Sequence, residues 1–276
     1  MRDERTLLQV LDQPDDQIDL GRAALLLARC ECPGLDVERE LARLEALAEA
    51  ARLPLSIHKA SLDRVKALRL FLAETCGFRG NEQDYYDPKN SCLNHVLDRR
   101  VGIPITLSVL YMEVGRRLGA PLAGVGLPGH FLLKYYDSND DALFIDPFHG
   151  GRFVDSSGCR DLVRRMYEGR LSFHPSFLEP VDKRYIVLRM LNNLRSIYVH
   201  GQQFSKALRV IEMILAITPA SSDDLKQRGL IHYKLGHYKQ ARQDLEACLF
   251  LNPQSADAEA IQQTIAELKR LTAMLN

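Results

Sequence analysis

Apolar residues recur at helical spacing through most of the N-terminal part of the chain. In the segment DVERELARLEALAEAARL, leucines recur every three residues, and Asp36 stands where a helix cap is preferred. Similar patterns predict helices over residues 19–28 and from residue 61 to a stop at Gly77. The segment GFRGNEQDYYDPKN is rich in turn-forming residues and lacks periodicity, so we expect a loop there.

The middle of the chain changes from helical to strand-like patterning. A short helix is expected to begin at Ser91, and a longer one over residues 104–118. The stretch LAGVGLPGHFLLKYYDSNDDALFIDPFHGGRFVD then predicts three or four short strands. His130 would open one strand and Asp146 would close the next, with an SNDD turn at 138–141 between them. Across such an antiparallel pair the two side chains should meet at about 3 Å.

The C-terminal part contains an internal repeat with a period of 34 residues. Small, aromatic and apolar residues and a proline recur in register, which resembles the tetratricopeptide repeat. The matching pairs are Ile197 and Ile231, Phe204 and Tyr238, Ala207 and Ala241, Leu215 and Leu249, and Pro219 and Pro253. The expected helices are 187–200, 203–217, 223–236, 238–251 and a capping helix over 256–275.

A proline-containing break, FHPSFLEPVD, separates these two kinds of pattern. We therefore expect residues 1–180 to hold N-terminal helices and an α+β core over about 90–160. Residues 183–276 would hold the helical repeats. A small number of repeats buries little apolar surface by itself. We therefore expect the tail to pack against the first part of the chain for stability.

Composition limits the possible classes of function. The 276 residues are 46% hydrophobic and 26% charged, as in a globular protein. Thirty-six basic residues balance thirty-six acidic ones, so no global field favours nucleic acid or a membrane surface. The chain shows no signal-peptide pattern and no long apolar run, and its six cysteines form no CxxC pair. We expect a cytoplasmic protein with reduced thiols.

The order of helix, His strand and Asp strand resembles the transglutaminase-like (papain-like) core. The motifs NSCLNHVLDRRVGIPITLSVLYMEVGRRLG, PGHFLLKY and FIDPFHGG, followed by repeats, resemble the Sir-B-type bacterial family of transglutaminase-like proteins with tetratricopeptide repeats. The resemblance is strongest over residues 90–152. It implies an α+β transglutaminase-like fold with an all-α tail, and it implies no particular activity. It places His130 and Asp146 on the family's catalytic His and Asp.

The nucleophile of the resembled family is missing. Its Gly-x-Cys position falls on Gly102-Ile103-Pro104, so a proline stands where a thiol would be. Proline is well tolerated at a first helical position. Thr106 is one alternative nucleophile, Ser108 a weaker one, and Cys92 on the preceding helix is the thiol nearest in sequence. Each also has a structural reading, as a polar group at a helix end or as a small packed side chain.

Other chemistry has weaker support in the sequence. His130, Asp146, His149 and His95 are acceptable metal ligands, but no ligand-spacing motif connects them, so neither a metal nor a cofactor is expected. The adjacent Tyr85 and Tyr86 are candidates for the rim of a cleft or for ordinary surface residues. No cysteine is expected to be unusually reactive.

Two classes of function follow. The first is a catalytically degenerate scaffold that binds a protein or peptide partner through its repeats. The second is a hydrolase or acyltransferase in which His130 is the base, Asp146 orients it, and the nucleophile is water or a non-standard side chain. The missing thiol favours the first class.

Overall fold

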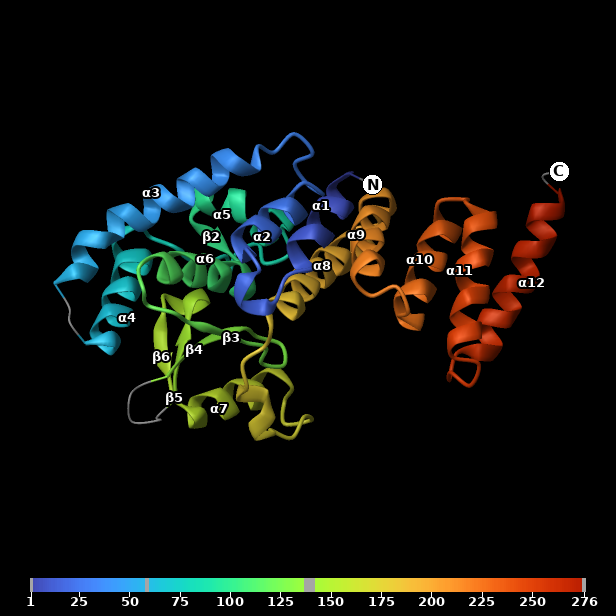
Figure 1. Cartoon of the computed structure of the whole chain (residues 1–276). Coiled ribbons are helices and arrows are strands. Elements are labelled where there is room, and N and C mark those ends of the chain that lie inside the picture. Colours follow the sequence, from blue (N-terminus) through green and yellow to red (C-terminus); the bar gives the residue numbers. More distant parts are fainter. Residues whose placement is uncertain (1, 58–59, 137–141, 275–276) are drawn as a thin grey trace. The chain divides into compact units, whose positions relative to one another are not determined.

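The computed structural model describes residues 2–57, 60–136 and 142–274. The chain divides into two compact units (Figure 1). One comprises residues 9–190, and the other comprises the described residues of 1–8 and 191–276. No helix in the described part of the chain is long and apolar enough to cross a bilayer.

The N-terminal helices begin where the sequence places their caps. Asp19 accepts a hydrogen bond from the Arg22 amide, and Asp36 accepts one from the Arg39 amide. The predicted stop at Gly77 is confirmed, since this glycine has a φ of +76°. The elements are α1 (Arg2–Leu11), the 3-10 turn η1 (Asp15–Gln17), α2 (Leu20–Ala28), α3 (Val37–Ser56), α4 (Ser61–Leu70) and the π-helical turn η2 (Phe71–Thr75).

The segment predicted to be a loop is partly ordered into short elements. Arg79 and Gly80 pair in parallel with Val101 and Gly102. The helix that follows, α6, is buried along nearly its whole length and has Pro104 as its first residue. It packs against α2 to α5 and against the main sheet. The elements are β1 (Arg79–Gly80), η3 (Pro88–Ser91), α5 (Leu93–Arg99), β2 (Val101–Gly102) and α6 (Pro104–Arg117).

The main sheet is a four-stranded antiparallel meander in the order β3-β4-β5-β6. Leu133 pairs with Ile145 and Lys134 pairs with Phe144, which aligns the strand after His130 with the strand that ends at Asp146. The strand expected to open at His130 begins two residues later, and the predicted SNDD turn lies outside the described residues. The strands are β3 (Ala123–Val125), β4 (Leu132–Tyr136), β5 (Ala142–Asp146) and β6 (Arg152–Val154).

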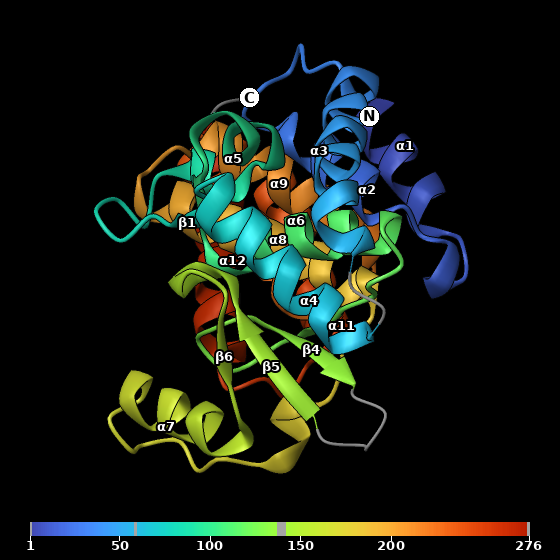
Figure 2. The same cartoon turned by 90° about the vertical axis from the view of Figure 1, so that its left-hand side faces the viewer.

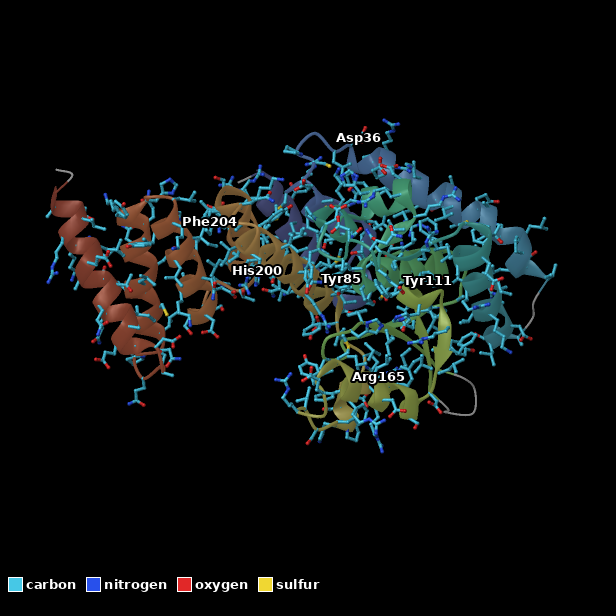
Figure 3. All side chains as sticks on the ribbon, turned by 180° about the vertical axis from the view of Figure 1, so that it is seen from behind. Asp36, Tyr85, Tyr111, Arg165, His200 and Phe204 are labelled. Atoms are coloured by element: carbon cyan, nitrogen blue, oxygen red, sulfur yellow. The ribbon has the colours of Figure 1, made fainter. Side chains whose placement is uncertain are left out.

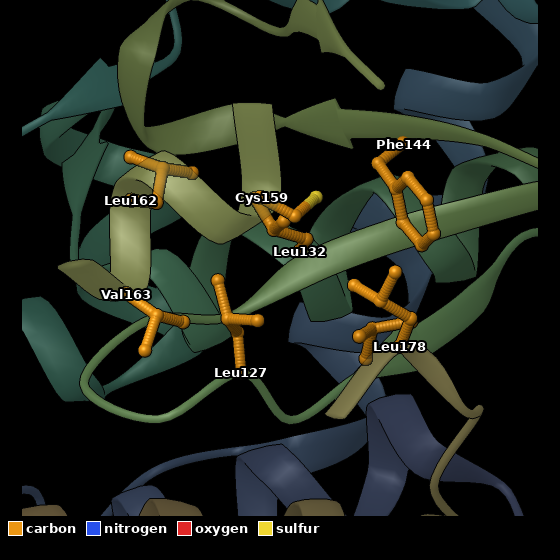
Figure 4. Packing of buried hydrophobic residues seen from close by; sticks show 8 residues of the cluster. Leu127, Leu132, Phe144, Cys159, Leu162, Val163 and Leu178 are labelled. Carbon is orange, nitrogen blue, oxygen red and sulfur yellow. The ribbon is translucent and has the colours of Figure 1, made fainter. Parts of the chain in front are cut away.

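Helix α7 (Ser156–Met166) lies on one side of this sheet and α6 on the other (Figures 1 and 2). The sequence pattern did not predict α7, although Asp155 caps it by accepting from the Gly158 amide. A buried apolar cluster joins α7 to the sheet, and Figure 4 shows how its side chains interlock. The cluster contains Val125, Leu127, Leu132, Phe144, Cys159, Leu162, Val163 and Leu178. The turn η5 (Pro175–Leu178) supplies its last member.

The repeat helices follow the predicted pairing closely. Ala207 and Ala241, which match across the 34-residue period, are both fully buried, as close packing of paired helices requires. His200 ends the first of these helices and Phe204 begins the second (Figure 3). The helices are α8 (Lys183–His200), α9 (Phe204–Ile217), α10 (Ser222–Lys234), α11 (Tyr238–Leu251) and α12 (Ala258–Met274).

Candidate active site around Asp146

Asp146 is a fully buried carboxylate at the end of β5. His130 Nε2 lies 3.0 Å from its Oδ1 atom, which confirms the contact expected from the strand pairing. His130 itself is only 6% exposed and follows a turn in which Gly129 has a φ of +71°. Beside an ionised carboxylate Nε2 is the donor, so the tautomer leaves Nδ1 as the basic nitrogen of His130.

A second imidazole binds the same carboxylate. The residues Pro147, Phe148 and His149 form a 3-10 turn that begins at Asp146. This turn brings His149 Nδ1 to 2.6 Å from Asp146 Oδ2, and the His149 amide to 3.4 Å from Oδ1. The sequence pattern indicated His149 only as a possible metal ligand. The signal that identifies it is the Asp-Pro-x-His spacing, because an Asp before a proline-started turn accepts from the residue three positions later.

The surroundings keep Asp146 ionised. Burial by itself would raise the pKa of this carboxyl group, but the hydrogen bonds and charge interactions with His130 and His149 outweigh burial and lower the pKa to about 2. The Arg152 guanidinium also lies 3.3 Å from Oδ2. Asp146 is therefore an anion that orients two imidazoles.

Arg189 supports His130 from a distant part of the sequence. Its guanidinium donates to the carbonyl groups of Leu127 (2.9 Å) and His130 (2.6 Å). The same group lies 5.5 Å from the centre of the Phe131 ring, as in a cation–π contact. Arg189 thus fixes the turn that carries His130. Because 59 residues separate Arg189 from His130, no local pattern indicated this role.

Aromatic rings surround the two imidazoles. Phe148 makes edge contacts with His130 at 6.2 Å and with His149 at 5.1 Å between ring centres. Tyr85 packs edge-on against Phe148 at 5.9 Å, and Tyr86 packs against Tyr85. The segment that contains the two tyrosines therefore lies beside the histidines.

His149 is the more accessible of the two imidazoles. Its side chain is 35% exposed and lines a cavity of about 480 Å³. Because Nδ1 is bound to Asp146, Nε2 is the nitrogen available to a molecule in this cavity. The remaining wall is mostly polar, with Arg79, Asn81, Glu82, Gln83 and the apolar Phe148.

Among the described residues, the alternative nucleophiles form no hydrogen bond with His130 or His149. Thr106 and Ser108 are fully buried in α6, and their hydroxyl groups have no hydrogen-bond partner within the described structure. Cys92 is also fully buried, and its thiol faces the Pro88 carbonyl at 3.5 Å. Burial raises the pKa of Cys92 far above the ordinary thiol range. These surroundings weigh against a nucleophilic role for Cys92.

The negative charge of Asp146 affects the pKa of one thiol, that of Cys159. It lies in α7, in the apolar cluster beneath the sheet. Burial, followed by the charges of Asp155 and Asp146, raises the pKa of Cys159 to about 12. The sulfur contacts of Cys32 and Cys92 go to His95, Asn94 and Pro88 and not to His130 or Asp146.

The donor atoms of His130, Asp146 and His149 all lie within 4.8 Å of one another. These residue types suit a divalent cation. However, both carboxylate oxygens already accept hydrogen bonds from the imidazoles, and Arg152 brings positive charge to the same oxygen as His149. Protein donors therefore satisfy the carboxylate. His95 is not part of this cluster, because its ring contacts Cys32 instead.

Comparison with known proteins shows the family of the chain. The model of the transglutaminase-like superfamily matches residues 38–192, and a tetratricopeptide-repeat model matches residues 194–266. The chain therefore belongs to the transglutaminase-like superfamily and carries tetratricopeptide repeats after that domain. Repeats of this kind generally mediate protein–protein interactions.

Several relatives align along most of the chain. A UPF0162 protein of Xylella fastidiosa is 37% identical over 259 residues, which cover 92% of this chain and 91% of the relative. A UPF0162 protein of Vibrio cholerae is 30% identical over 264 residues, covering 95% and 97%. Human F-box only protein 21 is 29% identical over 180 residues, which cover 62% of this chain and 28% of that protein.

Proposed function

We propose that this protein is a catalytically degenerate transglutaminase-like scaffold that binds a protein or peptide partner through its repeats. The observation that carries the proposal is the start of α6, where Pro104 occupies the position of the cysteine in the resembled family. A proline offers no nucleophile, and an imidazole–carboxylate pair without a nucleophile has only part of a covalent mechanism.

The repeats supply the proposed partner surface. Helix α10 carries the exposed apolar residue Leu230, which is 41% exposed, among charged neighbours. The partner of α10 in its repeat, α11, carries the more exposed Phe250. In a stack of paired helices the first helices of the pairs line the concave surface. We therefore assign the partner contact to α10.

Substitutions on the two helices test this proposal in the full-length chain. A partner captured by the intact chain and then purified would be titrated against Leu230→Glu and Phe250→Glu. Leu230→Glu should weaken binding by about tenfold or more, because a buried charge disrupts an apolar contact, whereas Phe250→Glu should not. Asp146→Asn should leave binding unchanged. Equal binding by Leu230→Glu and the unaltered chain would contradict the proposed surface.

Point substitutions are preferable to removing residues 183–276. Arg189 lies in that segment and donates to the turn that holds His130. A truncation would therefore remove a support of the first unit together with the repeats, and its effects on binding and folding could not be separated.

The second candidate function is a hydrolase that uses water as the nucleophile. It is favoured by the two imidazoles on one ionised carboxylate and by the cavity beside His149. A panel of activated esters and amides would be incubated with the unaltered chain, Asp146→Asn and His149→Gln. Turnover that disappears in both variants would support the hydrolase and contradict the degenerate scaffold. His200→Gln leaves the site intact and should match the unaltered chain. Turnover by the unaltered chain no higher than that of Asp146→Asn and His149→Gln would support the scaffold.

A further inference from the structure

A second thiol-bearing cluster lies apart from Asp146. Cys32 follows α2 in a turn, where its amide donates to the Ala28 carbonyl at 2.9 Å. Its sulfur lies 3.1 Å from Nε2 of His95 in α5. Both residues are partly exposed to solvent. An imidazole nitrogen at this distance can accept the thiol proton and form a thiolate–imidazolium pair.

Asn94 adds a polar group to the same cluster. Its amide nitrogen donates to the Cys32 sulfur at 3.8 Å, and its side chain is 95% buried, since only 5% is exposed. The amide oxygen of Asn94 has no hydrogen-bond partner among the described residues. The unpaired oxygen leaves an acceptor for a polar molecule beside the thiol.

Most other cysteines lie in surroundings that oppose ionisation. Burial raises the pKa of Cys76, Cys92, Cys159 and Cys248. Cys30 is only 3% exposed. Cys32 has an imidazole partner, the ring of His95. It therefore combines a proton acceptor with access to solvent.

We propose that Cys32 and His95 form a reactive thiol site that is modified by small electrophiles of the hydroperoxide class. The thiolate sulfur attacks one peroxide oxygen, so that an S–O bond forms and the O–O bond breaks. The sulfur is oxidised by two electrons to a sulfenic acid, and the peroxide is reduced. The departing oxygen takes the proton that His95 holds and leaves as water or an alcohol. This site does not depend on the function proposed for the rest of the protein.

Timed alkylation of the native full-length chain tests the first step. Iodoacetamide would be added at about pH 6, and the modification of each cysteine followed by peptide mass analysis. Cys32 should react at least about tenfold faster than Cys76, which is also partly exposed. His95→Gln should slow Cys32 by about tenfold at pH 6, and this difference should shrink towards pH 9, where thiols ionise without help. A purely structural role for His95 would not produce this pH dependence.

The matched control is His200→Gln, which removes a histidine from α8 and should leave the rate at Cys32 unchanged. Hydrogen peroxide with a sulfenic-acid trap then tests the electrophile, and the trap should label Cys32 selectively. The site is refuted if Cys32 reacts no faster than Cys76, or if folded His95→Gln matches the unaltered chain at pH 6. Rapid alkylation without trapped sulfenic acid would refute the hydroperoxide class. If His95→Gln fails to fold, the unaltered chain decides, because an activated Cys32 should react at pH 6 at least about tenfold faster than a free cysteine peptide with an ordinary thiol pKa.

Discussion

Replacing Asp146 by asparagine should destabilise the first unit and remove part of its acid sensitivity. The carboxylate is fully buried and accepts from both His130 and His149. An amide in its place carries no charge and presents an NH₂ group to one of these donors. Removing one partner of a buried charged network costs about 3 kcal/mol. We therefore expect the free energy of opening of β4 and β5 to fall by about that amount at neutral pH.

The pH dependence follows from the lowered pKa. The folded-state pKa of Asp146 is about 2, compared with an ordinary value of 3.8. A difference of roughly 2 pKa units corresponds to between about 2 and 3 kcal/mol of stability, at about 1.4 kcal/mol per unit. Because the folded pKa is the lower one, this contribution is complete above pH 3.8 and is lost as the pH falls towards 2. Asp146→Asn should lack this loss.

Hydrogen exchange of the backbone amides in β4 and β5 is the suitable assay, because it reports on this unit separately from the repeats. Asp161→Asn is the matched control. This carboxylate is 51% exposed and pairs with Arg164 on the surface, so its removal should cost less than about 1 kcal/mol. The protection of the β4 and β5 amides would be compared between Asp146→Asn and Asp161→Asn at pH 7 and again at pH 3. Equal protection in the two variants at both pH values would show that the buried carboxylate does not stabilise this unit.

Four further substitutions test other parts of the fold by urea unfolding. Gly151→Ala should lower the free energy of unfolding by about 2 kcal/mol, and Gly150→Ala by about 1 kcal/mol. Both glycines have a positive φ, but only the Cβ added at Gly151 meets the Arg69 side chain, at 2.5 Å. Equal losses in the two variants would contradict this contact. Thr106→Val should be neutral or slightly stabilising, because it removes a buried hydroxyl group that has no hydrogen-bond partner in the described structure. A loss of stability above about 1 kcal/mol would show that the hydroxyl group makes a stabilising hydrogen bond. Arg189→Ala should lower the free energy of unfolding by about 2 kcal/mol, because two hydrogen bonds to backbone carbonyl groups are lost. Unchanged unfolding would show that the turn before β4 is stable without Arg189.

Local sequence determined most of the helical architecture. The caps at Asp19 and Asp36 and the stop at Gly77 depend on hydrogen bonds and dihedral angles within a few residues of each position. The 34-residue period predicted the repeat helices, because each pair reuses the same packing positions. The His130–Asp146 contact also followed from the sequence, since a short hairpin places the two strands in register.

Tertiary structure decided which other side chains join these elements. Arg189 reaches the His130 turn from 59 residues away, and Cys32 meets His95 across 63 residues. Helix α7 has a mostly polar sequence, and its few apolar residues become a core only against the sheet. Whether His149 is accessible depends on the cavity formed with β1 and the segment after it. Hydrogen bonds between neighbouring residues can be read from their spacing, whereas contacts between remote segments depend on how helices and sheet pack, which no local pattern specifies.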